Sequence, residues 1–255
     1  MPLPSLRDAL GSGLVVSGWS SLIDPLVHEA LLRAPFDAIM LDMQHGLHDL
    51  KSVSQAVAVA GALGKPAIVR VPVDDRATVS RALDLGASAV IMPMIETVED
   101  ARRFVSVAKY PPLGLRSYGP ARALDVHGYD SPADYAASAN RETLSFAMIE
   151  TRAALDDLEA ILAIDGLDGV FVGPSDLSIA LAGDGTRNPE SAECVAAIER
   201  VAKVAELAGK IAAIYAASVG EARRYRDFGY RLVCVSSDIA MLKAAAVDIA
   251  KAVRT

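Results

Sequence analysis

Short apolar segments of strand length alternate with longer helical segments along the whole chain, and this alternation limits the possible folds more than any other feature. The strand-like segments cover residues 14–18, 36–42, 67–71, 89–94, 144–149, 169–172, 211–215 and 231–236. The segments with helical periodicity cover residues 25–34, 50–63, 76–85, 98–108, 153–164, 192–207, 219–228 and 239–253. Eight such units in 255 residues predict a closed (β/α)8 TIM barrel, with an open doubly wound parallel sheet as the alternative.

The chain has no Ser/Gly-rich linker or charge block, so we expect one barrel domain over residues 1–255. One connection is unusually long. It runs over residues 109–142 with YPPLGLRSYGPARALDVHGYD at its centre. A long irregular connection inside a compact domain is usually functional or part of an interface.

The composition narrows the class of ligand and the compartment. A net charge of −7 and a pI near 5.1 argue against nucleic acid or an anionic membrane as partner, because such binding needs clustered Lys and Arg. We therefore expect a small-molecule substrate. The only cysteines, Cys194 and Cys234, lie in apolar surroundings typical of buried thiols, and the N-terminal residues do not resemble a signal peptide, so we expect a cytoplasmic protein.

Polar and charged residues follow the apolar runs, and in a parallel barrel the chemistry lies at these carboxyl ends. In chain order the residues at the strand ends are Trp19 and Ser20, Asp42 and His45, Arg70, Pro93 and Met94, Glu150, Gly173 to Asp176, Tyr215, and Ser236 to Asp238. Two acids, a candidate base and a cation are thus expected to converge.

The carboxylates of Glu150 and Asp176 follow neighbouring strands and are candidates for a metal site. Two carboxylates with several waters suit Mg²⁺ or Mn²⁺. Either acid could instead cap a helix or interact with a helix dipole. The four histidines have no zinc-ligand spacing, and no CxxC or HExxH is present.

Arg70 and His45 are the candidates for charge stabilisation and proton transfer. An arginine at the end of a buried strand needs a carboxylate, phosphate or ligand partner, so Arg70 is either a functional residue or half of a structural ion pair. Asp42, three residues before His45, could orient its imidazole, although His45 could also be an ordinary loop residue. We expect His48 to belong to a solvated helix start.

The segment Gly173-Pro174-Ser175-Asp176 is a turn leading into a helix, where free backbone N–H groups would hold a carboxylate or phosphate. It lacks the Lys and the glycine spacing of a nucleotide-binding loop. None of the seven lysines lies at a strand's carboxyl end, which argues against a Schiff-base mechanism.

Several motifs together resemble the HpcH/HpaI family of class II, metal-dependent pyruvate aldolases, which includes hydroxy-keto acid aldolases. The motifs are LDMQHG (41–46), VRVP (69–72), LDLGASAVIMPMIET (83–97), PLGLRSYGPAR (112–122), MIET (148–151) and GLDGVFVGPSDLS (166–178). The resemblance covers nearly the whole chain. It implies a barrel of the phosphoenolpyruvate/pyruvate type and a homohexamer built as a trimer of dimers, with the last helix (239–253) packing on a neighbouring subunit.

The resemblance also implies roles for individual residues. Glu150 and Asp176 match the family's metal ligands. Arg70, His45 and Asp42 match its catalytic residues, and Asp84, which looks like an ordinary helix residue, matches a further catalytic Asp. The substrate-binding set that we expect is Arg70, Trp19, Tyr215, Gly173, Pro174 and Ser175.

Three positions depart from the common family pattern and concern the aldehyde preference. Gln44 stands where many members have Glu, which removes a negative charge beside His45. Met148 stands where many have Gln, and Tyr215 where relatives often have a smaller aliphatic residue bordering the aldehyde.

The activity that these residues predict is the reversible cleavage of a 4-hydroxy-2-keto acid to pyruvate or hydroxypyruvate plus an aldehyde, with Mg²⁺, Mn²⁺ or Co²⁺ as cofactor. An oxaloacetate decarboxylase or a related enolate-forming lyase is the alternative enzyme. An acyl-CoA lyase is disfavoured because no basic cluster for the CoA phosphates is evident. A barrel that binds a keto acid without catalysis is the non-enzyme alternative.

Overall fold

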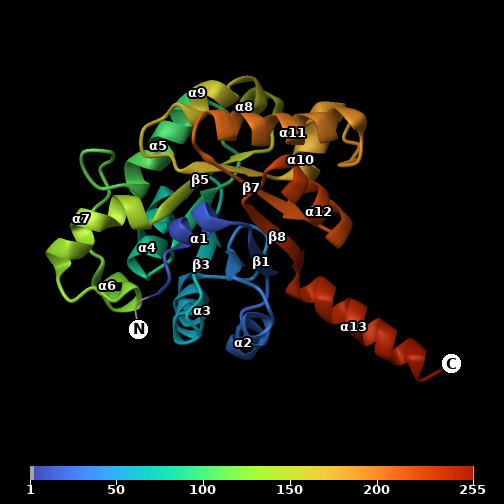
Figure 1. Cartoon of the computed structure of the whole chain (residues 1–255), viewed down its shortest axis with the longest axis horizontal. Helices are drawn as coiled ribbons and strands as arrows, with labels where there is room; N and C mark the ends of the chain where they lie inside the picture. The colour runs from blue at the N-terminus through green and yellow to red at the C-terminus, as the bar shows by residue number, and fades with distance from the viewer. Residues whose placement is uncertain (1–2, 255) are drawn as a thin grey trace.

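Eight parallel strands pair in chain order and close on themselves in the computed structural model, which describes residues 3–254 (Figure 1). The strands are β1 (Val15–Ser20), β2 (Ala38–Asp42), β3 (Ala67–Arg70), β4 (Ala89–Met92), β5 (Leu144–Ile149), β6 (Gly169–Val172), β7 (Ile211–Ala216) and β8 (Leu232–Ser237). Strand β1 pairs with both β2 and β8, which completes the barrel. The (β/α)8 prediction is confirmed, and the open sheet is excluded.

The helices surround the strands and agree with most of the expected segments. They are α1 (Leu6–Ser12), α2 (Pro25–Arg33), α3 (Leu50–Ala62), α4 (Arg76–Asp84), α5 (Val98–Ala108), α6 (Ala121–His127), α7 (Pro132–Glu142), α8 (Arg152–Asp156), α9 (Leu158–Leu162), α10 (Pro174–Ala182), α11 (Ala192–Leu207), α12 (Val219–Phe228) and α13 (Asp238–Ala252).

The sequence had indicated that the long connection over residues 109–142 is irregular, and this prediction is wrong. It contains α6 and α7, which form a small separate core around Tyr110, Ala123, Tyr135 and Ala139. Short helices with few apolar residues have weak periodicity, which explains why they were missed.

Side-chain alternation along each strand separates two cores. On β2, Met40 belongs to the cluster inside the barrel, whereas Ile39 and Leu41 belong to the cluster between strands and helices. The same parity on β3 directs Ile68 inward. Because the period is two, the residues two positions further along, Asp42 and Arg70, extend the inward rows at the carboxyl ends.

The two ends of the barrel differ. Helix α1 contributes Leu6 and Leu10 to the interior cluster, which closes the end where the strands begin. The C-terminal helix α13 instead leads away from the barrel and is not packed along its side (Figure 1).

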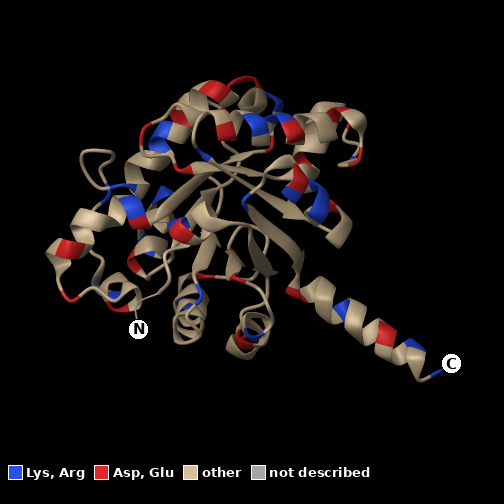
Figure 2. Ribbon diagram, in the orientation of Figure 1, with Lys and Arg blue, Asp and Glu red and all other residues tan. Residues whose placement is uncertain are grey.

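Among residues 3–254, no helix is long and apolar enough to cross a membrane. Lys and Arg are interspersed with Asp and Glu over the outer helices (Figure 2).

Candidate active site

A cavity of 300 Å³ lies at the carboxyl ends of the strands, where a parallel barrel carries its chemistry. All six residues expected to bind substrate line it. The lining residues are Trp19, Ser21, His45, Arg70, Met148, Phe171, Gly173, Pro174, Ser175, Asp176, Tyr215 and Ser237. Ser21 and Phe171 were not anticipated. For Phe171 the inward parity of β6 was the available signal, but Ser21 lies beyond its strand and gives none.

Asp42 and Arg70 form a bidentate ion pair across neighbouring strands. Arg70 Nε donates to Asp42 Oδ1 at 2.9 Å, and Arg70 Nη2 donates to Oδ2 at 2.7 Å. The two residues are in register on β2 and β3, and both side chains are buried. Burial opposes ionisation of Asp42, but the hydrogen bonds and charge of Arg70 outweigh it and hold the pKa of this carboxyl below its usual value.

The pairing of Asp42 differs from the one expected. Its carboxylate accepts hydrogen bonds from the backbone N–H groups of Gln44 at 3.0 Å and His45 at 3.3 Å, and both oxygens are engaged by Arg70. The imidazole of His45 has no hydrogen-bond partner within the described part of the chain. Asp42 therefore positions the backbone of His45 rather than its ring, because Arg70 occupies the carboxylate.

Glu150 directly follows β5 and continues the inward row of Phe146 and Met148, and it is 2% exposed. Its Oε1 accepts a hydrogen bond from the Met94 backbone N–H at 2.7 Å. Met94 has a φ of 51°, a left-handed conformation that is unusual for a residue with a side chain. A Cβ on Gly173 would lie 2.5 Å from Glu150 Oε2, so any side chain there would displace the Glu150 carboxylate.

Burial raises the pKa of Glu150, and the neighbouring charge of Asp176 raises it further. Asp176 is exposed to the cavity in the first turn of α10. Within residues 3–254, Oε2 of Glu150 accepts no hydrogen bond and Asp176 forms no ion pair. Two adjacent carboxylates with unused oxygens, one of them buried, fit the hard oxygen ligands that a divalent cation needs.

The N-terminus of α10 faces the same cavity. Gly173 is the N-cap residue and provides no side-chain hydrogen bond, and the first intrahelical bond is donated by Leu177. The N–H groups of Ser175 and Asp176 are thus left for a ligand, as expected from the sequence.

An aromatic wall completes the cavity. The Trp19 and Tyr215 rings meet edge to face with centroids 5.1 Å apart. The Trp19 ring also lies 4.7 Å from the Arg70 guanidinium carbon and donates from Nε1 to Asp42 Oδ2 at 3.3 Å. Trp19 therefore contacts both members of the Asp42–Arg70 ion pair from the cavity side.

Three predicted site residues, Asp42, Glu150 and Asp84, are absent from the cavity lining. Asp42 pairs with Arg70 and Glu150 lies against Gly173, both of which line the cavity, whereas Asp84 is paired elsewhere. It ends α4, where its carboxylate accepts a hydrogen bond from Arg116 Nη2 at 2.6 Å. The Arg116 side chain is fully buried in the connection between α5 and α6. Within one subunit, Asp84 therefore holds this connection, and its catalytic role stays a prediction.

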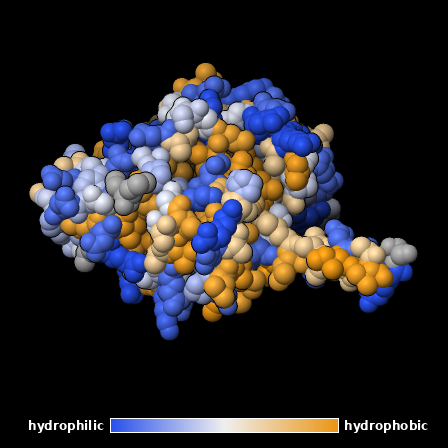
Figure 3. Space-filling model, turned by 60° about the horizontal axis from the view of Figure 1, so that its bottom comes forward, coloured by the Kyte–Doolittle hydropathy of each residue, from blue (hydrophilic) through white to orange (hydrophobic). Residues whose placement is uncertain are grey.

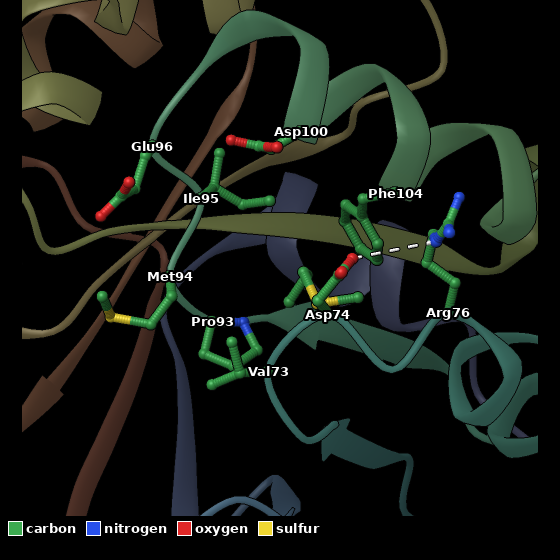
Figure 4. A pocket seen from close by; sticks show the side chains of 10 residues that line it. Val73, Asp74, Arg76, Pro93, Met94, Ile95, Glu96, Asp100 and Phe104 are labelled. Atoms are coloured by element: carbon green, nitrogen blue, oxygen red, sulfur yellow. Dashed lines mark ion pairs between the residues drawn. The ribbon is translucent and has the colours of Figure 1, made fainter.

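A second cavity of 350 Å³ lies beside the Met94 loop, and Figure 4 shows its lining. Two of its three acids have structural partners: Asp100 accepts a hydrogen bond from the Thr97 backbone N–H at 3.0 Å, and Asp74 lies 3.8 Å from Arg76. Only Glu96 is left, and a single carboxylate is a poor site for a divalent cation. The candidate active site is therefore the first cavity.

The family model described as HpcH/HpaI aldolase/citrate lyase matches residues 16–245. A hydroxypyruvate/pyruvate aldolase from Roseovarius nubinhibens is 38% identical over 245 residues, which cover 95% of this chain and 94% of that protein. A 5-keto-4-deoxy-D-glucarate aldolase from Escherichia coli is 34% identical over 91% of this chain and 89% of its own length.

A solved structure agrees with these relatives. The crystal structure of an HpcH/HpaI aldolase from Desulfitobacterium hafniense superposes with a TM-score of 0.90 at 28% identity, covering 100% of this chain and 97% of that one. The fold, the family model and the relatives lead to one conclusion: the chain belongs to the HpcH/HpaI aldolase/citrate lyase family and is a carbon–carbon lyase of the aldolase type.

Proposed function

We propose that this enzyme is a divalent-metal-dependent aldolase that cleaves 4-hydroxy-2-keto acids to pyruvate or hydroxypyruvate and an aldehyde. The observation that carries the proposal is the pair of Glu150 and Asp176, whose unused carboxylate oxygens lie beside the free N-terminus of α10 and the Arg70 guanidinium. The aldolase names of the relatives support the same activity.

Glu150 and Asp176 would hold the metal. A bound Mg²⁺, Mn²⁺ or Co²⁺ supplies Lewis-acid stabilisation of negative charge on the keto oxygen. The protein's own groups bind and orient the substrate: the N–H groups of Ser175 and Asp176 receive its carboxylate, and Arg70 stands beside the oxygen where the charge develops.

His45 is the candidate base. In the cleavage direction its imidazole accepts the proton of the 4-hydroxyl, the C3–C4 bond breaks, and the electron pair forms the enolate of the 2-keto acid. The aldehyde leaves, and protonation of the enolate at C3 gives pyruvate. The exposed ring of His45 has no partner among residues 3–254 that would compete for this proton. Trp19 and Tyr215 border the space beyond C4 and would shape the aldehyde preference.

Metal removal tests the proposal. We expect EDTA-treated enzyme to lose cleavage of a 4-hydroxy-2-keto acid and to regain it with Mg²⁺, Mn²⁺ or Co²⁺. Glu150→Gln and Asp176→Asn should weaken Mn²⁺ binding and lower kcat by about 10²-fold or more, because the metal's charge stabilisation is lost. Glu159→Gln on α9, which changes an exposed acid paired with Arg200, is the matched control.

Two results would contradict the proposal: activity that survives EDTA, or a lysine adduct trapped by borohydride in the presence of pyruvate. Parallel assays on oxaloacetate would show whether decarboxylation exceeds aldol cleavage.

We further propose that α13 packs on a second copy of the chain. Ile239, Leu242, Ala246, Ile249 and Val253 recur at helical spacing, and the four large ones are exposed. Figure 3 shows hydrophobic side chains along this projecting helix. An apolar groove of 430 Å³ lies on the barrel between α2 and α12, over the strands that α13 leaves uncovered, with Leu14, Phe36, Val219 and Val235 in its lining.

The groove is where the last helix of a (β/α)8 barrel would pack, so the α13 of another subunit is the occupant that we propose. A homohexamer is the expected assembly. The expected cytoplasmic location rests on cysteine usage, since Cys194 and Cys234 are both free and buried.

A further inference from the structure

Asp238 is a buried carboxylate at the first residue of α13, 4% exposed, and it does not line the cavity. Its Oδ2 accepts three hydrogen bonds, from Ser20 Oγ at 3.0 Å and from the backbone N–H groups of Ser21 and Leu22, each at 2.9 Å. Its Oδ1 accepts one from its own neighbour, Ile239 N, at 2.8 Å. One carboxylate therefore holds three consecutive residues at the end of β1.

The segment held by Asp238 supports the loop that carries His45. Ser21 accepts a hydrogen bond at its carbonyl oxygen from Leu47 N at 2.9 Å. Gly46 lies so close that a Cβ on it would be 3.1 Å from Ser21 Cα and 2.3 Å from the Asp42 carbonyl oxygen. Ser21 and His45 both line the cavity. The His45 loop thus rests on a segment whose position depends on Asp238.

Two buried histidines complete the support. His28 Nε2 donates to the Leu22 carbonyl oxygen at 2.9 Å, and His48 Nε2 lies 3.2 Å from Ser20 Oγ. His48 is 6% exposed and its ring stacks on His28 at 5.3 Å, so the expected solvated position is wrong. Burial lowers the pKa of both rings, that of His48 to about 4, which leaves them uncharged near neutrality.

Asp238 consequently has no cationic side chain as partner in the described chain, and N–H and O–H dipoles balance its charge. A buried carboxylate without a cationic partner lowers the stability of the folded protein. If this position served stability alone, a residue without a charge would be more favourable. Ser236, two residues earlier, has a φ of 56°, a strained backbone conformation that leads into Asp238.

We propose that Asp238 is a positioning residue for the aldol reaction: it fixes the end of β1 and, through Ser21, the loop that presents His45. The inference rests on the proposed function of His45. In this role the first residue of α13 would support the catalytic face without lining the cavity.

Kinetics of Asp238→Ala and Asp238→Asn test this role. We expect Asp238→Ala to lower kcat for cleavage by about 10²-fold, the loss typical of a catalytic group displaced by about 1 Å. KM for the keto acid and Mn²⁺ affinity should stay within about twofold, since the proposed metal ligands and the N–H groups proposed to receive the substrate carboxylate lie at the end of β5 and the start of α10. Asp238→Asn keeps one acceptor oxygen and should recover part of kcat. Asp134→Ala, which removes an exposed acid from the first turn of α7, is the control.

Hydrogen exchange of the substrate-free protein separates this inference from the proposed function. We expect the Ser21, Leu22 and Leu47 amides to exchange faster in Asp238→Ala than in the wild type, with the Met94 amide unchanged. A wild type without aldolase activity would overturn the proposed function. Unchanged exchange in Asp238→Ala would show that Asp238 does not hold the end of β1. The positioning role is wrong if exchange accelerates while kcat is unchanged, or if kcat falls only because the assembly dissociates. If Asp238→Ala does not fold, Asp238→Asn and Ser20→Ala provide the same comparison.

Discussion

At the scale of single residues, the Asp42–Arg70 pair determines what the catalytic face can do. Both carboxylate oxygens of Asp42 are used by Arg70, and the remaining hydrogen bonds go to backbone N–H groups and Trp19. Arg70 Nη1 has no hydrogen-bond partner among residues 3–254, so it is available for the proposed contact with the substrate. A planar guanidinium can serve both partners at once, which a lysine ammonium cannot.

Arg70→Lys should therefore lower kcat/KM by about 10²-fold, the typical loss when one preorganised donor to a developing oxyanion is removed. The melting temperature should fall as well, because half of a buried bidentate pair is lost. Steady-state kinetics and thermal unfolding measure the two effects. Arg103→Lys, in the exposed pair with Glu99, is the control. Wild-type kinetics in Arg70→Lys would show that catalysis does not need the planar guanidinium of Arg70.

At the scale of elements, α6 and α7 turn the long connection into a packed layer. His127 at the end of α6 stacks on Tyr135 of α7 at 6.3 Å, beside the buried Arg116. Burial, together with the nearby charge of Arg116, lowers the pKa of His127 to about 4. The ring is thus neutral in the folded protein and titrates near 6.5 in the unfolded chain.

This difference predicts how stability depends on pH. Between pH 6.5 and about 4 the unfolded chain binds more protons than the folded one at His127, so its contribution to stability is present above pH 6.5 and is lost as the pH falls. His127→Phe keeps the ring stacking and removes the titration. The variant should lose less stability than the wild type from pH 7 to pH 4.5 in denaturant unfolding.

The difference in pH dependence between the wild type and His127→Phe measures the contribution of His127 alone. Glu150, whose raised pKa changes stability in the opposite direction, is present in both proteins. Parallel stability curves for wild type and variant over this range would show that His127 titrates normally.

At the scale of the whole molecule, α13 exposes apolar surface that one subunit does not cover. Leu242 is 65% exposed and Ile249 is 67% exposed. Contiguous exposed apolar surface of this kind marks an interaction site. Because Asp238 lies at the start of the same helix, the surface proposed for assembly and the loop that carries His45 meet at one residue.

Charges on the apolar face of α13 test the proposed assembly. Leu242→Asp combined with Ile249→Asp should reduce the molar mass in light scattering from that of a hexamer to that of smaller species, because burying the two carboxylates would be unfavourable. Ala244→Asp with Lys251→Asp changes the opposite face and should leave the mass unchanged. An unchanged mass in the first variant would mean that α13 does not form the interface.

The local order of residues determined the barrel and most of the site. Apolar runs with a period of two identify the inward rows, and the residues that extend those rows at the strand ends, such as Asp42, Arg70 and Glu150, could be predicted because barrel geometry brings all strand ends together. The start of α10 was equally readable, since a Gly-Pro turn before a helix leaves N–H groups free.

Only the tertiary structure decided which partner each polar group has. Asp42 binds Arg70 rather than the His45 ring, His48 is buried against Ser20, and Asp238 anchors the end of β1, although these residues are far apart in the sequence. The direction of α13 was also beyond local sequence, because an apolar helical stripe is the same whether it covers its own barrel or a neighbour's. Partner choice depends on distances across the fold, and sequence periodicity contains no such distances.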